Sequence, residues 1–209
     1  MDIGIIGSGA MGRGMGGTWA LKGHRVCFSY SRDPARLAAI AQAAGNGART
    51  GTPEDAADFG EVVILAVPWP LVLDLLARVG SRLNGKTLIS CVVPWNGDRS
   101  RLFVESGTSA AEEIASQVPA ANVVETLAVL SDALDGSPFS PPERASMFYC
   151  GDCPVAKATV ADLIEDLGIE PVDAGGLRIA RFLEPMAALL QHLAVGQGQG
   201  MQIALKLLR

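Results

Sequence analysis

A glycine-rich segment follows the first apolar run of the sequence and precedes the first stretch with helical character. Its residues are Gly7, Ser8, Gly9, Ala10, Met11 and Gly12, which fit the pattern G-x-G-x-x-G. At a strand-to-helix turn, Gly7 permits the tight turn, Gly9 lets the backbone approach a diphosphate, and Gly12 lets the helix pack closely on the strand. The diphosphate then meets unpaired N–H groups and the positive end of the helix dipole. We therefore expect these six residues to bind a dinucleotide; the alternative is an ordinary turn.

The residues about twenty positions after the glycines indicate which dinucleotide is favoured. An NAD enzyme places an acid on the ribose 2′-hydroxyl, whereas an NADP enzyme places hydroxyl and basic groups around a 2′-phosphate. This chain has Ser31 and Arg32 there, with Arg36 one helical turn further on. Arginine offers a planar, permanently charged fork that suits phosphate oxygens. The pattern favours NADP(H); the alternative takes Asp33 as a ribose acid, although Pro34 behind it makes Asp33 a better helix N-cap.

Two predicted strands end in the same three-residue pattern. The two segments are Val67-Pro68-Trp69 and Val93-Pro94-Trp95. In open parallel sheets, ligands bind beyond the carboxyl ends of the strands. Each segment places a stiff proline and a large flat ring there, so we expect the first to contact NADP(H), and Pro94 and Trp95 to contact a second planar ligand. The alternative is that both tryptophans are ordinary packing residues.

Other reactive residue types indicate no chemistry of their own. Cys150 and Cys153 form a C-x-x-C, but it lacks a second cysteine pair for zinc and lies late in the fold, so we expect no metal or redox site there. His24 is expected to be a solvated surface histidine in the turn at the sheet edge opposite the cofactor, and His192, on an apolar helix, a buried histidine with its hydrogen bonds satisfied; the alternative for His192 is a catalytic role. The sequence shows no nucleophile–base pair and no paired carboxylates, so no catalytic side chain is predicted.

Strands and helices must alternate to position these segments. Short β-branched runs near residues 2–7, 26–30, 62–67 and 87–92 alternate with helical stretches, and the same alternation continues to a long apolar helix over about 177–195. This order predicts an α/β protein of the Rossmann type, with a doubly wound, mainly parallel sheet and helices on both faces. We expect one domain over residues 1–209, with a nucleotide-binding core to about residue 130. The C-terminal extension, about 131–209, is expected to help form the acceptor pocket and to end in a short helix after Gly196, Gly198 and Gly200.

Composition excludes several other classes of protein. The 209 residues are 49% hydrophobic and 19% charged, which is typical of a globular chain able to bury a core. A formal charge of −5 leaves no basic surplus for nucleic acid. The run from Val62 to Leu73 is too short to span a bilayer and contains prolines, and no secretory signal is apparent, so a cytoplasmic protein is expected.

Taken together, these motifs resemble those of the NADPH-dependent coenzyme F420 reductases, to which the N-terminal reductase domain of the STEAP metalloreductases is related. The resemblance covers nearly the whole chain. Its motifs are the glycine loop, Ser31-Arg32 with Arg36, Val67-Pro68-Trp69, Ser109-Ala110-Ala111-Glu112, Cys150-Gly151-Asp152, Val172-Asp173-Ala174-Gly175 and Ala180-Arg181-Phe182-Leu183-Glu184-Pro185.

The resemblance implies hydride transfer between NADP(H) and a deazaflavin stacked on the nicotinamide. Such transfer needs two rings at close approach more than it needs an acid or base, in keeping with the missing catalytic constellation. The resemblance also implies a homodimer whose C-terminal segment helps to form the deazaflavin pocket.

One position departs from the family pattern close to the expected acceptor site. The family usually places a histidine or asparagine where this chain has Ala128. Cofactor binding is unaffected, but the acceptor ring loses a polar anchor. The alternatives are therefore an NADPH-dependent flavin, metal or imine reductase, and a non-catalytic module that senses NADP(H).

Overall fold

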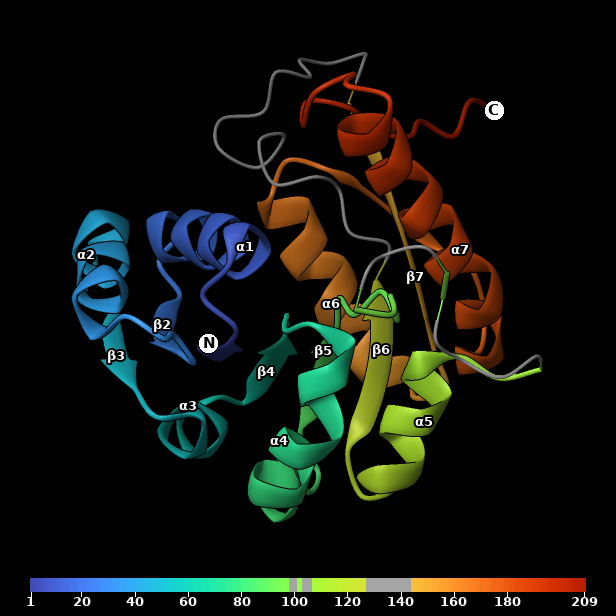
Figure 1. The fold of residues 1–209 in the computed structure, drawn as a ribbon. Coiled ribbons are helices and arrows are strands. Elements are labelled where there is room, and N and C mark those ends of the chain that lie inside the picture. Colours follow the sequence, from blue (N-terminus) through green and yellow to red (C-terminus); the bar gives the residue numbers. More distant parts are fainter. Residues whose placement is uncertain (98–100, 103–106, 127–143) are drawn as a thin grey trace.

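The structure, a computed structural model, describes residues 1–97, 101–102, 107–126 and 144–209. One mixed sheet runs through the molecule (Figure 1). Its strands are β1 (Asp2–Ile6), β2 (Arg25–Ser29), β3 (Arg49–Gly51), β4 (Val62–Leu65), β5 (Thr87–Ser90), β6 (Asn122–Thr126), β7 (Ser146–Gly151) and β8 (Glu170–Asp173). The spatial order is β3-β2-β1-β4-β5-β6-β7-β8.

The order of the strands reverses between β1 and β4. From β1 the chain first builds outward to β2 and β3 and then returns to place β4 on the other side of β1. Every neighbouring pair is parallel except β6 with β7, which is antiparallel. This arrangement confirms the predicted doubly wound, mainly parallel sheet of Rossmann type, and it places a topological switch point between β1 and β4.

Helices cover both faces of the sheet (Figure 1). The helices are α1 (Ala10–Leu21), α2 (Pro34–Ala44), α3 (Pro53–Phe59), α4 (Val72–Val79), α5 (Ala110–Gln117), α6 (Pro154–Asp166) and α7 (Ala180–Gln191). Helices α1, α2 and α6 share one apolar core with alternate strand residues, and the other four helices share a second core with the intervening residues. Along β1, for example, Ile3 and Ile5 belong to the first core and Ile6 to the second.

The local sequence accounts for several helix ends. Asp33 caps α2 by accepting hydrogen bonds from the backbone N–H groups of Ala35 and Arg36 at 2.9 and 3.2 Å. Thr52 and Asp55 form a reciprocal capping box at the start of α3. On the first core, the Trp19 indole N–H donates to the carbonyl of Leu163 at 2.8 Å and joins α1 to α6.

The end of the chain differs from the prediction. Helix α7 runs into a π-helical turn (His192–Gly196), but no helix follows it among residues 201–209. The tail instead runs beside β7, where the Ser146 N–H donates to the Leu205 carbonyl at 2.8 Å and the Leu207 N–H donates to Ser146 Oγ at 3.0 Å. The predicted final helix is therefore wrong, because these contacts hold the backbone extended and a helix this short has little stability of its own.

Two carboxyl groups are buried between α5, α7 and the sheet. Glu184 of α7 accepts hydrogen bonds from the backbone N–H groups of Ala110 and Ala111, both at 3.0 Å, and so caps α5. Burial raises the pKa of Glu184 to about 7 despite these bonds. Glu125 of β6 is 3% exposed, and its Oε2 has no hydrogen-bond partner within the described part of the chain. Burial, and secondarily the nearby Glu184, raise the pKa of Glu125 well above 4.5.

A raised carboxyl pKa makes stability fall as the pH rises. The folded protein holds the Glu125 proton more tightly than the unfolded chain, so folding is favoured below the unfolded pKa and the advantage is lost as the pH climbs toward the folded pKa. Glu125→Gln mimics the protonated acid and removes this dependence. Relative to the unmodified protein, we expect its free energy of unfolding to rise as the pH is raised above about 4.5, by up to about 1.4 kcal/mol per pH unit.

Urea denaturation at several pH values measures this difference. Glu61→Gln makes the same chemical change at an exposed position and serves as the control. A stability difference between Glu125→Gln and the unmodified protein that stays constant across this pH range would contradict the assignment of a buried, protonated Glu125.

Candidate functional site

The predicted site segments converge at the switch point of the sheet. The loops that follow β1, β4 and β5 lie at the carboxyl ends of three adjacent parallel strands. Two cavities open there, of about 540 and 560 Å³, and Gly9, Ala66, Val67 and Pro68 line both. The two cavities are therefore neighbours that share one wall at the glycine loop and the end of β4.

The glycines of the loop serve two different purposes. Gly7 has φ +117°, and a Cβ there would stand 2.2 Å from the Ala66 carbonyl oxygen. A Cβ on Gly12 would stand 2.0 Å from the Gly7 carbonyl oxygen. Both positions thus require glycine for packing, whereas a Cβ on Gly9 would meet no atom within 4 Å. Gly9 is the N-cap of α1 and supplies no side-chain cap, so the first turn of α1 keeps donors for an anion.

The 540 Å³ cavity gathers the residues predicted to select the 2′-phosphate. Ser31, Arg32 and Arg36 line it together with Gly7, Ser8, Tyr30 and Asp33. The Asp33 carboxylate is already engaged in capping α2, which weakens the alternative that it binds a ribose hydroxyl. Tyr30 has φ +63°, a left-handed conformation that is uncommon for a bulky residue, and its carbonyl accepts the Ser8 hydroxyl at 3.2 Å. This strained residue turns the chain from β2 toward the arginines.

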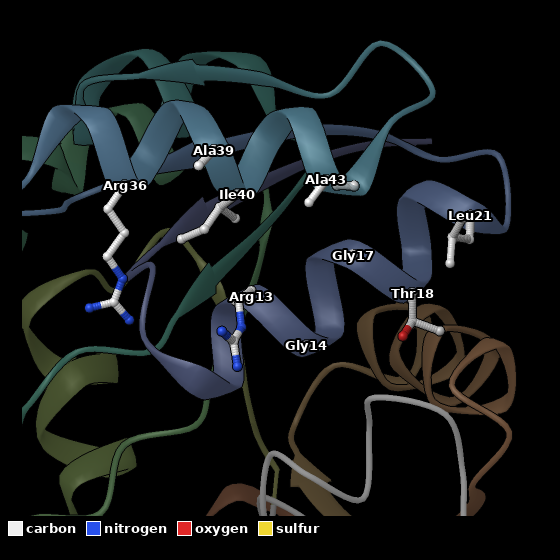
Figure 2. Close-up of a pocket in the computed structure, with 10 residues that line it drawn as sticks. Arg13, Gly14, Gly17, Thr18, Leu21, Arg36, Ala39, Ile40 and Ala43 are labelled. Carbon is white, nitrogen blue, oxygen red and sulfur yellow. The ribbon is translucent and has the colours of Figure 1, made fainter.

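A second arginine lies near Arg36. Figure 2 shows the side chains of Arg13, from the first turns of α1, and Arg36, from the start of α2, extending to the same side of the two helices. Both border a shallow groove of about 730 Å³ between α1 and α2, whose other residues are small or apolar. Arg36 also lines the 540 Å³ cavity, so it lies between the two spaces. Arg13 was not predicted to belong to the site. In the sequence it is marked only by being a basic residue directly after Gly12.

The 560 Å³ cavity is built from apolar and neutral polar groups. Every described residue that lines it is uncharged; the lining includes Ala10, Met11, Trp69, Cys91, Val93, Trp95, Asn96, Gln191 and Met201. Burial raises the pKa of the Cys91 thiol to about 12, and its Sγ lies 3.2 Å from Thr126 Oγ1, so it stays protonated at neutral pH. The lining therefore offers no acid or base that ionises near neutral pH.

The two tryptophans occupy different positions in this cavity. Trp69 is 6% exposed and belongs to the second core, so packing accounts for much of its environment. Trp95 is less buried, and its indole N–H donates to Gln191 Oε1 at 2.6 Å. Pro94 is buried and does not line the cavity. Ala128, predicted to contact the acceptor, lies outside the described residues.

The surroundings of the C-x-x-C segment, Cys150 to Cys153, indicate a structural role. Cys150 is fully buried, and burial raises its pKa to about 12. Cys153 is the N-cap of α6, and neither cysteine forms a disulfide. Within the described ranges, no three histidine, cysteine or acidic side chains are grouped as a metal site would require.

Two residues from the C-terminal part of the chain were not predicted to belong to the site. Gln191 and Met201 reach the 560 Å³ cavity from the end of α7 and from the tail. Neither belongs to a recognisable motif, because only the folding of α7 across α5 brings them to the switch point. Gly12 was predicted to contact the cofactor and lines neither cavity, which agrees with its packing role.

The fold and the paired cavities define a nucleotide-binding protein of the Rossmann class with room for a second small molecule. Residues 2–94 match the family model described as NADP oxidoreductase, coenzyme F420-dependent. Over 163 residues, 72% of this chain and 70% of the relative, the chain is 31% identical to the F420-dependent NADP reductase of Methanocaldococcus jannaschii. The chain belongs to this family of NADP-dependent oxidoreductases, and membership implies NADP(H) and coenzyme F420 as cofactors.

Two further comparisons extend this result. The chain is 31% identical to rat metalloreductase STEAP3 over 183 residues, which are 87% of this chain but only 35% of that protein. A solved structure from Arthrobacter sp. FB24, assigned as an F420-dependent NADP reductase, superposes over both whole chains with a TM-score of 0.88 at 24% identity, which supports the fold. No helix in the described part of this chain has the length and apolar character needed to cross a membrane.

The glycine loop gives a test that separates binding from folding. Gly9→Ala adds a methyl group in open space, so the variant should keep its thermal stability yet bind NADPH at least about tenfold more weakly, because the methyl group occupies the approach of the diphosphate. Gly12→Ala should instead lower the melting temperature sharply.

Calorimetric titration with NADPH and thermal unfolding measure the two effects. Gly17→Ala, also on α1 and also in open space, is the control: it should leave NADPH affinity unchanged and keep or raise the melting temperature, because Ala is the better helix former. A Gly9→Ala variant with unchanged affinity would show that the diphosphate does not approach this loop.

Proposed function

We propose that this protein transfers a hydride between NADPH and a deazaflavin of the coenzyme F420 type. The observation that carries the proposal is the pair of adjoining cavities, one bordered by Arg32 and Arg36 and the other uncharged and bordered by Trp69 and Trp95. A charged nucleotide half and a neutral ring-binding half are what a hydride transfer between two planar rings requires. Family membership supports the same reaction.

The binding roles follow from the geometry of each cavity. Gly7, Ser8 and Gly9, with the first turn of α1, would hold the diphosphate, and Ser31, Arg32 and Arg36 the 2′-phosphate. Ala10, Met11, Val67, Pro68 and Trp69 would enclose the nicotinamide. The acceptor would lie on the far side of that ring, toward Trp95 and Gln191.

The protein's contribution to the reaction is position and exclusion of water. NADPH, when bound, supplies the hydride from its nicotinamide ring. The uncharged walls of the 560 Å³ cavity hold two rings at close approach and provide no side chain that must be titrated first. We therefore expect a rate of transfer that depends little on pH near neutrality.

We further propose that the chain acts as one domain, in which the part after about residue 131 completes the acceptor cavity. Gln191 and Met201 in the cavity lining support this role. The homodimer and the cytoplasmic location implied at the sequence level stay predictions.

Nucleotide preference tests the first half of the proposal. The unmodified protein should bind NADPH far more tightly than NADH, since only NADPH presents a phosphate to the arginines. Arg32→Ala and Arg36→Ala should each weaken NADPH binding by roughly 10- to 100-fold, as loss of a charge-assisted hydrogen bond costs about 1.5–3 kcal/mol, and leave NADH binding unchanged. Arg25→Ala, an exposed arginine at the opposite end of β2, is the control. Equal affinities for the two nucleotides would remove this argument.

Acceptor turnover tests the second half. NADPH absorbance is followed with oxidised F420, FMN, FAD or a cyclic imine as the only acceptor, and we expect oxidation coupled to F420. Turnover with the imine alone would move the assignment to imine reduction, and turnover with FMN alone toward the metalloreductase relatives. Tight NADPH binding without any turnover would favour the sensing module.

A further inference from the structure

One hydrogen bond connects the end of helix α7 to the loop after β5. The Trp95 indole N–H donates to Gln191 Oε1 at 2.6 Å, and both side chains line the 560 Å³ cavity. The loop is itself tightly turned, since the Trp95 backbone N–H donates to the Val93 carbonyl at 2.8 Å and Trp95 bridges to Leu102. The backbone of Trp95 is thus held by its own loop, and its indole ring is held by Gln191.

The chemistry of this bond determines how the Gln191 amide is oriented. An indole nitrogen can only donate, so the group that faces it must be the amide oxygen. The –NH₂ group at the other end of the same planar amide then has two N–H bonds to donate. Within the described part of the chain it has no hydrogen-bond partner, and Gln191 is part of the cavity lining.

The surroundings make such a donor significant. The described lining of the cavity carries no charge, so a polar ligand atom can be recognised there only by neutral hydrogen-bonding groups. Asn96 is the other amide in the lining, and its Oδ1 accepts the Arg101 N–H at 3.1 Å within its own loop. Gln191 is also the last residue of α7 before a π-helical turn, a feature that is frequent at functional sites.

We propose that Gln191 positions Trp95 with its oxygen and recognises a carbonyl group of the acceptor ring with its amide N–H. This inference rests on the proposed function and specifies the class of acceptor: a planar ring with a conjugated carbonyl edge, as in a deazaflavin or a flavin, in preference to a cyclic imine without one. In the transfer, the C4–H bond of the nicotinamide breaks, and its electron pair forms a C–H bond at C5 of a deazaflavin or an N–H bond at N5 of a flavin. The resulting negative charge spreads to the conjugated carbonyl, where an N–H donor stabilises it, and solvent supplies the proton.

Three variants separate the two ends of the amide. Gln191→Leu removes both the amide oxygen and the N–H donors. Gln191→Glu keeps an oxygen that can accept from the indole but replaces the N–H donors by a second acceptor. Trp95→Phe removes the indole N–H. Gln199→Leu makes the same change as the first at an exposed position outside the cavity lining and is the control. The probes are oxidised F420 and, in parallel, FMN.

Binding and fluorescence are measured beside turnover. For Gln191→Leu and Gln191→Glu we expect the dissociation constant of the acceptor to rise roughly 10-fold or more, as for loss of one or two hydrogen bonds, with NADPH affinity unchanged. The fluorescence of Trp95 is taken as the difference between each protein and its Trp95→Phe variant. Its emission maximum should shift in Gln191→Leu, which loses the indole hydrogen bond, and stay unchanged in Gln191→Glu, which keeps it. A merely structural role would instead make both variants lose NADPH affinity or thermal stability.

The possible failures are distinguishable. If the unmodified protein reduces F420 and Gln191→Leu binds F420 with unchanged affinity, this inference is wrong and the proposed function stands. If Gln191→Glu binds the acceptor as well as the unmodified protein, the amide N–H makes no contact with it and the inference is again overturned. If the unmodified protein reduces neither acceptor, the proposed function falls, and the inference falls with it.

Discussion

The close backbone contact between the glycine loop and the end of β4 is the constraint on which the site depends. A side chain at Gly7 would overlap the Ala66 carbonyl, and one at Gly12 would overlap the carbonyl of Gly7 itself. With glycine at both positions, the start of α1 and the segment after β4 meet at the switch point, and both cavities have this contact as their common wall. If the glycine loop and the segment after β4 were further apart, the phosphate-binding half of the site would be separated from the ring-binding half. A hydride can move only between rings in contact.

The second half of the chain supports the same site through two polar contacts between α7 and α5, one buried and one partly buried. Glu184 caps the N-terminus of α5, and Arg181 forms two hydrogen bonds of 2.7 Å with Glu112 on that helix. These residues belong to the motifs through which the sequence resembles its family. Their contacts fix α7 against α5, so that Gln191 at its far end reaches the loop after β5. In this structure the family motif that contains Arg181 and Glu184 joins α7 to α5. It influences the site only indirectly, through the position of Gln191 about two to three helical turns further along α7.

The sequence predicted the fold and the grouping of Ser31, Arg32 and Arg36 with the glycine loop around one cavity, for identifiable physical reasons. Alternating apolar runs and capping residues such as Asp33 are local signals, and the glycine loop carries its mechanism within six residues. The acceptor half was harder to predict. Gln191 is an unremarkable polar residue in an apolar helix until α7 is docked, and Pro94, predicted beside Trp95 in the lining, is turned into the protein. The extended tail likewise depends on contacts with Ser146 some sixty residues earlier, which no local pattern contains.

The distribution of charge around the switch point explains how one site can handle two such different ligands. The arginines line the 540 Å³ cavity, where in the proposed complex the charge of the 2′-phosphate would outweigh the loss of their hydration. On the ring side the ionisable thiol of Cys91 is held protonated by burial, and the two buried carboxyl groups, Glu125 and Glu184, lie outside the lining. The described lining of the ring cavity therefore contributes neutral dipoles, which would need no reorganisation when negative charge arrives with the hydride. In such a cavity a single well-oriented amide has more influence on acceptor choice than it would beside a charged side chain, because no ionic interaction competes with it.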